Sequence, residues 1–124
     1  MNLDPDPVNF DLCIAAGEAG DLLDGLDTQT ARKIRLCEID HLAAFRPESR
    51  PTVLVLSRAL ATPAAPELLS ALPRHVIILT TDPGAVRIAE RSGRPFIDSR
   101  DLSMPKGLAR TLRAALRESR DLLA

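Results

Sequence analysis

Two short segments of this sequence contain only β-branched residues and leucine, and they limit the possible folds more than any other feature. The segments are TVLVL, at residues 52–56, and VIIL, at residues 76–79. A strand that is open to water on one face alternates apolar and polar residues, whereas a continuous apolar run is typical of a strand buried on both faces. Such strands occur mainly in parallel sheets that helices cover on both sides. The sequence therefore predicts an α/β fold.

Weaker signals extend these two strands into a regular alternation of strands and helices. Asp82 followed by Pro83 predicts the start of a helix that Gly93 ends, and Thr62 followed by Pro63 predicts the start of another. Further strands are expected at 10–16, 32–39 and 95–97, and further helices at 18–26, at 40–45 and from 105 to the end. A strand–helix order repeated five times predicts a three-layer sandwich with a five-stranded parallel sheet.

The chain has 124 residues, which is the length of one domain, and we expect three parts within it. Residues 1–9 are polar and contain Pro5 and Pro7, which favours a flexible N-terminal arm. We expect residues 10–116 to form the folded domain. Residues 117–124 are expected to continue the last helix beyond it, as the start of a linker to an output domain.

The charge balance and the scarcity of aromatic residues argue against several kinds of partner. The formal net charge is −1, so no basic excess draws the chain to nucleic acid or to an acidic membrane. Three Phe and no Trp or Tyr leave few side chains on which the bases of single-stranded nucleic acid can stack. No signal-peptide pattern and no apolar run of membrane-spanning length occurs, so we expect a cytoplasmic protein.

Two longer stretches of the sequence resemble parts of a known family. They are PTVLVLSRALATPAAPELLSAL, at residues 51–72, and HVIILTTDPGAVRIAERSG, at residues 75–93. The first is similar to the third strand, loop and third helix of a receiver domain of bacterial response regulators. The second resembles the fourth strand and helix of the same family, including the Thr at the end of the strand. The resemblance extends over roughly residues 10–118 and implies the flavodoxin-like topology of receivers.

Receivers need five positions for phosphorylation: an acid pair that holds magnesium, an aspartate that accepts the phosphoryl group, a Thr or Ser, and a lysine. The resemblance places these positions on Ala16 and Gly17, with Glu18 as the nearest carboxylate, then on Ser57, Thr80, and Ser99 or Arg100. Only Thr80 is of the required type. Magnesium prefers oxygen ligands and is held in proteins by one or two carboxylates. The resemblance thus implies a pseudo-receiver without phosphorylation, catalytic residues, metal or cofactor.

The signalling surface of receivers lies on the fourth helix, the fifth strand and the fifth helix. The last helix here carries Leu108 and Leu112 on one stripe, and Leu116 and Leu123 on another. One stripe can pack on the sheet while the other stays exposed, and exposed apolar stripes usually mark a contact. The resemblance implies an interaction face, for a protein partner or for a second copy of the chain, that consists of Phe96, Leu108, Leu112, Leu116 and Leu123.

Two other kinds of function are consistent with the same pattern. A flavodoxin-like module that binds a small molecule or a nucleotide would use the carboxyl ends of the strands. An enzyme with Ser57 or Cys13 as nucleophile would need an adjacent base, and the sequence offers none. Cys13 and Cys37 are expected to be buried free thiols, which can form a disulfide only if their strands are neighbours. Neither His41 nor His75 is expected to bind a metal.

Overall fold

The computed structural model describes residues 10–18, 20, 28–80, 82–98 and 105–123. Strands and helices alternate along most of this part of the chain, as the sequence predicts. The elements are β1 (Phe10–Ala15), α2 (Thr28–Arg32), β2 (Ile34–Ile39), the 3-10 helix η1 (Leu42–Ala44), β3 (Thr52–Leu56), α3 (Ala65–Ser70), β4 (Val76–Thr80), α4 (Pro83–Ser92), β5 (Phe96–Asp98) and α5 (Pro105–Leu123).

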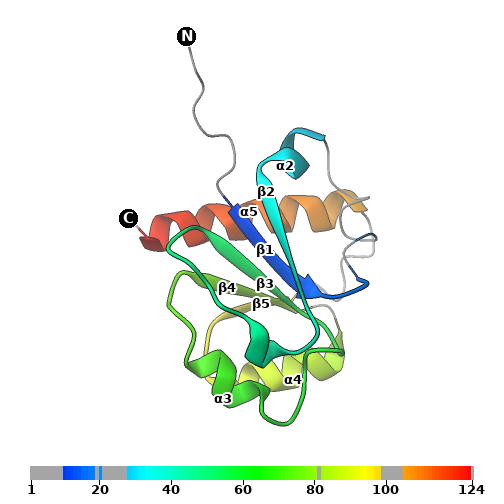
Figure 1. The fold of residues 1–124 in the computed structure, drawn as a ribbon, viewed down its shortest axis with the longest axis vertical. Coiled ribbons are helices and arrows are strands. Elements are labelled where there is room, and N and C mark those ends of the chain that lie inside the picture. The colour runs from blue at the N-terminus through cyan, green and yellow to red at the C-terminus, as the bar shows by residue number, and fades with distance from the viewer. Residues whose placement is uncertain (1–9, 19, 21–27, 81, 99–104, 124) are drawn as a thin grey trace.

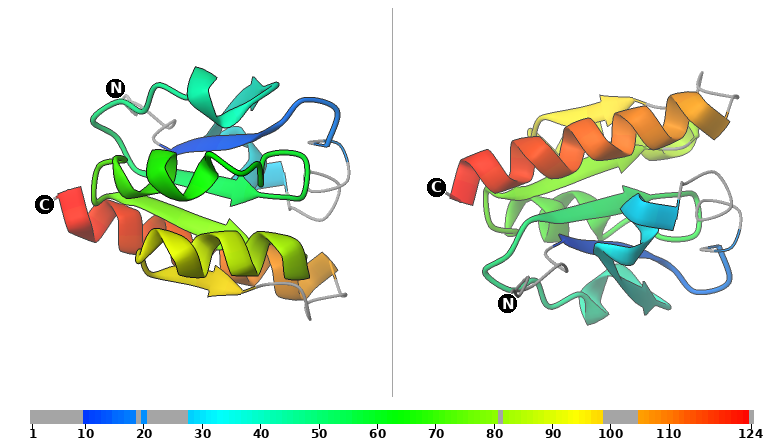
Figure 2. Two further views of the ribbon diagram at one scale, coloured as in Figure 1. Left: turned by 90° about the horizontal axis from the view of Figure 1, so that it is seen from below. Right: turned by 90° about the horizontal axis from the view of Figure 1, so that it is seen from above.

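The five strands form one sheet in the order β2-β1-β3-β4-β5, and every neighbouring pair is parallel (Figure 1). The prediction of a five-stranded parallel sheet is therefore confirmed. Helices α3 and α4 lie on one side of this sheet and α5 lies on the other, as the two opposite views in Figure 2 show. Strand β2 is at an edge, which agrees with the alternating polar residues of its sequence.

Side chains of the three central strands point alternately into two apolar clusters. The cluster beneath α3 and α4 takes Cys13, Ala15, Leu54, Leu56, Val76 and Ile78 from the sheet. The cluster beneath α5 takes Leu12, Ile14, Val53, Val55, Ile77 and Leu79. Because both faces of these strands are buried, both sets of positions must be apolar. This arrangement explains why TVLVL and VIIL show no polar alternation.

One of the two predicted helix starts is confirmed and the other is wrong. The Asp82 carboxylate accepts the backbone N–H of Ala85 at 3.1 Å, and Gly93 ends α4 with a φ of 75°. Helix α3, in contrast, begins only at Ala65 and has no side-chain cap. The segment around Thr62 instead forms tight turns, in which the N–H groups of residues 60 and 61 both donate to the Ser57 carbonyl. Leu60 is completely buried in this segment.

The first predicted helix, 18–26, lies almost entirely outside the described residues. The structure has a short helix, α2, directly before β2, where the sequence predicted none. The predicted strand at 32–39 begins two residues later, at Ile34, because Arg32 is the last residue of α2. The predicted helix at 40–45 is present only as the single 3-10 turn η1.

Helix α5 packs on the sheet beyond the domain boundary that the sequence predicted at residue 116. Ser119 is fully buried at the amino edge of the sheet. Its hydroxyl accepts the N–H of Thr52 at 2.8 Å and donates to the carbonyl of His75. The folded domain thus includes at least part of 117–124. No helix in the described ranges is both long and apolar enough to cross a membrane.

The variant Ser119→Ala tests this attachment of α5. The substitution leaves a buried N–H and a buried carbonyl without their partner, so we expect the free energy of unfolding to fall by about 1–3 kcal/mol. Chemical denaturation measures this loss. The control is Ser70→Ala, which removes the hydroxyl of an exposed residue that bonds to the Pro66 carbonyl at 3.0 Å and to the Ser92 carbonyl at 2.7 Å. This variant leaves no backbone N–H without its partner, so it should cost less. Equal losses for the two variants would show that the Ser119 hydroxyl does not tie the helix to the sheet.

Candidate functional site

The carboxyl ends of β1, β3 and β4 lie together, because these strands are adjacent and parallel (Figure 1). Their common end is the carboxyl edge of the sheet, where ligands of open α/β folds usually bind. Four of the six predicted pocket residues follow a strand directly. They are Ala16, Gly17 and Glu18 after β1, and Ser57 after β3. Thr80 is the last residue of β4, and Ser99 lies outside the described residues.

The turn after β1 is held to the neighbouring strand β2. The N–H of Ala16 donates to the carbonyl of Ile39 at 2.9 Å, and the N–H of Gly17 donates to Oε1 of Glu38 at 3.2 Å. Gly17 has a φ of 88°, a conformation that other residues rarely adopt. Glu38 was not a site residue in the sequence analysis, because its role depends on the pairing of β1 with β2. At the positions where the resemblance predicts an acid pair, the turn presents backbone and the methyl group of Ala16.

Ser57 and Thr80 are both buried at this edge but differ in their hydrogen bonds. The Ser57 side chain is 7% exposed, and its Oγ has no hydrogen-bond partner in the described part of the structure. Thr80 is fully buried, and its Oγ1 donates to the carbonyl of Ile97 at 3.2 Å. The Thr80 hydroxyl therefore ties β4 to β5, while the Ser57 hydroxyl is a buried polar group that the described residues leave unsatisfied.

The carboxylates near this edge do not form a ligand set. Across the described ranges, no group of three or more His, Cys, Asp or Glu side chains is placed to hold a metal ion. Asp82 caps α4, and Glu38 accepts the N–H of Gly17. An acyl phosphate is formed by an aspartate, and magnesium must orient the incoming phosphoryl group. The position after β3 offers a hydroxyl instead.

The two cysteines lie opposite each other on the neighbouring strands β1 and β2, and both are free thiols. Burial raises the pKa of the Cys13 thiol to about 12, with a smaller contribution from Cys37. Burial also raises the pKa of Cys37. A thiol of such a high pKa is not a nucleophile at neutral pH. His75 lies at the other end of the sheet, where Nε2 bonds to the Glu48 carbonyl at 2.9 Å.

The predicted interaction face is wrong for two of its leucines. Leu112 and Leu116 both belong to the cluster beneath α5, and Leu116 is only 3% exposed. One leucine of each predicted stripe, Leu112 and Leu116, thus packs on the sheet, whereas Leu122 and Leu123 are exposed at 46% and 38%. Phe96 is half-buried and packs against the cluster beneath α3 and α4. The side chain of Leu108 lies outside the described residues.

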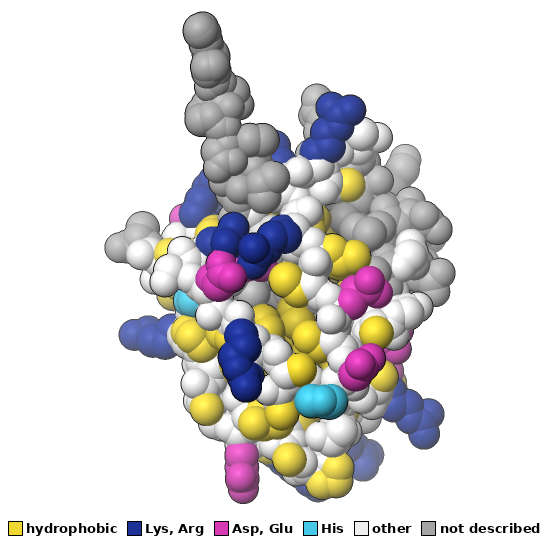
Figure 3. Space-filling model, in the orientation of Figure 1, with side chains coloured by type: hydrophobic (Ala, Val, Ile, Leu, Met, Phe, Trp, Pro, Cys, Tyr) yellow, Lys and Arg dark blue, Asp and Glu magenta, His cyan; other side chains and the backbone are white. Residues whose placement is uncertain are grey.

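A group of charged side chains that no sequence pattern predicted lies at the opposite, amino edge of the sheet. The Asp11 carboxylate, 5% exposed, accepts Nε of Arg35 at 3.1 Å and pairs with Nε of Arg50 at 3.3 Å. Glu48 pairs with both arginines, and these contacts lower the pKa of its carboxyl. Figure 3 shows basic and acidic side chains side by side on this part of the surface. The four residues come from three segments, so spacing in the sequence does not reveal them.

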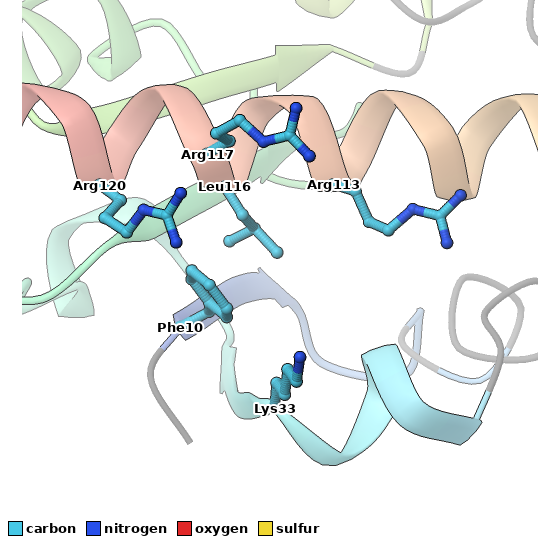
Figure 4. Close-up of a pocket in the computed structure, with 6 residues that line it drawn as sticks. All are labelled: Phe10, Lys33, Arg113, Leu116, Arg117 and Arg120. Carbon is cyan, nitrogen blue, oxygen red and sulfur yellow. The ribbon is translucent and has the colours of Figure 1, made fainter. Parts of the chain in front are cut away.

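A pocket of about 200 Å³ also opens at the amino edge, between α5 and the starts of β1 and β2 (Figure 4). We call it the basic pocket, because four of the six described side chains that line it are cationic. The lining residues are Phe10, Lys33, Arg113, Leu116, Arg117 and Arg120. Its three arginines follow helical spacing, which was visible in the sequence but is equally typical of a solvated helix face.

Comparisons of the chain with protein-family models, with curated proteins and with solved structures found no match.

The variant Ser57→Ala tests whether the unsatisfied hydroxyl matters for folding. Because Oγ has no partner within the described residues, its removal should change the free energy of unfolding by less than about 1 kcal/mol, or increase it. Chemical denaturation beside Ser119→Ala provides the matched comparison, since the same substitution there removes a buried hydroxyl with two partners. A loss at Ser57 as large as the loss at Ser119 would mean that the Ser57 hydroxyl is bonded in the folded protein.

Proposed function

We propose that this chain is a pseudo-receiver, a regulatory domain that signals through protein contacts and without phosphorylation. The strand order β2-β1-β3-β4-β5 supports the proposal, because it is the order of flavodoxin-like folds, to which receivers belong. Helices on both sides of the sheet are consistent with the three-layer sandwich of that topology. Thr80 at the end of β4, the Asp82 cap and the Gly93 stop match the stretch that resembles the fourth strand and helix of a receiver.

The observation that carries the proposal is the composition of the carboxyl edge. Ala16 and Gly17 stand where a receiver holds magnesium, and Ser57 stands where it accepts the phosphoryl group. A serine phosphate is a stable ester, whereas receivers switch through a labile acyl phosphate. The fold is thus kept while the groups that drive the switch are replaced. A domain of this kind acts through its surfaces.

The surface that we propose for contacts differs from the one that the leucine pattern predicted. Leu112 and Leu116 are buried in the core, so they are not part of the proposed contact surface. Leu122 and Leu123 are exposed large apolar residues on the last turn of α5. An extension of this helix into an output domain, or its pairing with a second copy of the chain, would cover both leucines. We place the contact at this end of α5, with Phe96 at the neighbouring edge strand.

A module that binds a small molecule or a nucleotide at the carboxyl edge is the second candidate. The buried, unsatisfied Oγ of Ser57 favours it, because a bound ligand would supply the missing hydrogen bond. The exposed leucines at the end of α5 favour contact-based signalling, and we rank it first.

Incubation with acetyl phosphate and magnesium tests the first proposal. We expect the intact mass of the protein to stay unchanged, because the position of the acceptor is Ser57 and the positions of the metal ligands are Ala16 and Gly17. A receiver domain with all five phosphorylation residues, treated in parallel, should gain one phosphate. If this chain also gains a phosphate, and hydroxylamine removes it, an acyl phosphate has formed and the proposal is wrong.

A further inference from the structure

We infer that the basic pocket is a binding site for a small phosphorylated ligand. The site lies at the amino edge of the sheet, opposite the carboxyl edge at which receivers react, and is thus separate from the proposed function. Lys33, Arg117 and Arg120 provide the cationic groups on which the inference rests, and Phe10 and Leu116 provide the apolar wall. Arg113 lines the same pocket and makes an interaction of its own.

The positive charges of Lys33, Arg117 and Arg120 are not neutralised by carboxylates of the described residues. Arg117 and Arg120 lie on one face of α5, and like charges at such a spacing destabilise a helix. At the same edge, Arg35 and Arg50 are neutralised by Asp11 and Glu48. No ion pair joins Lys33, Arg117 or Arg120 to a carboxylate of the described residues. A bound anion would offset this repulsion, as Asp11 and Glu48 offset the charges of Arg35 and Arg50.

The pocket is held in place by the core behind it. The N–H of Phe10 donates to the carbonyl of Lys33 at 3.2 Å, which fixes the start of β1 beside Lys33. Leu116 is buried in the cluster beneath α5, and Phe10 packs against that cluster. The hydroxyl of Ser119, one residue before Arg120, anchors the helix to β3 and β4. The backbone that carries the cations is therefore positioned before any ligand arrives, which lowers the entropic cost of binding.

The chemistry of the lining residues points to a phosphate group attached to an apolar or planar part. Arginine donates two parallel hydrogen bonds to phosphate oxygens, and lysine adds a point charge. Figure 4 shows Arg120 directed toward the ring of Phe10, with Leu116 beside them, so the charged and apolar parts of the pocket adjoin. Pockets for drug-sized ligands span roughly 300–1,000 Å³. A pocket of about 200 Å³ fits a smaller molecule, of the size of an aryl or sugar phosphate.

Calorimetric titration with phenyl phosphate and with inorganic phosphate, at matched ionic strength, tests the inference on the full chain. We expect saturable binding of phenyl phosphate, with a Kd below about 1 mM, and weaker binding of inorganic phosphate, which lacks the ring. Arg117→Gln and Arg120→Gln should each weaken binding of phenyl phosphate about tenfold. The control is Arg91→Gln, which removes the same charge from the exposed face of α4 and should leave the Kd unchanged.

The variant Phe10→Leu tests the apolar wall separately, because it changes the ring of Phe10 and leaves the charges of the pocket unchanged. This variant should reduce the preference for phenyl phosphate over inorganic phosphate, while affinity for inorganic phosphate stays the same. Circular dichroism checks that each variant is folded. Equal weakening by Arg91→Gln, or no saturable binding, would overturn the inference. Binding that emerges only after deletion of residues 1–8 would also overturn it, because Asp4 or Asp6 of that segment would then be the occupant of the pocket.

Discussion

Burial of both faces of the sheet is the constraint on which the rest of this structure depends. Strands β1, β3 and β4 place alternate side chains in two separate apolar clusters, and these strands have almost no surface that is open to water. Polar groups are therefore displaced to the two ends of the strands, where the backbone leaves the sheet. Every candidate site in the described part of the molecule lies at one of these ends, or on the helices beside them.

The two edges have opposite chemical character. At the carboxyl edge, the turn after β1 is held by backbone hydrogen bonds and by Glu38, and the Ser57 hydroxyl is buried without a partner. At the amino edge, Asp11 is buried between two arginines, and further cations gather under α5. The first edge is the one at which ligands of open α/β folds usually bind, and the cationic side chains of the basic pocket lie at the second.

Much of the fold was predictable from local pattern, because continuous apolar strands, the Asp82 cap and the Gly93 stop each leave a signature over a few residues. Leu116 could not be placed in that way, since its burial depends on the rotation of α5 against the sheet. The same holds for Arg94, whose Nη1 donates to the carbonyl of Leu69 at 3.2 Å, at the far end of α3. Side chains that bond across long sequence separations carry no local signal. Ala16, Gly17, Glu18 and Ser57 follow strands, and Thr80 ends one, but the hydrogen bonds of these residues and the basic pocket depend on the three-dimensional arrangement.

Under the proposed function, the carboxyl edge of this sheet does not hold a divalent cation. Titration with Mn²⁺, followed by NMR, measures cation binding directly, because the paramagnetic ion broadens the amide signals of residues close to it. The account predicts no saturable broadening of Gly17, Ser57 or Thr80, since the described residues at this edge provide no set of carboxylate ligands. Selective and saturable broadening of these three amides, relieved by excess Mg²⁺, would contradict it.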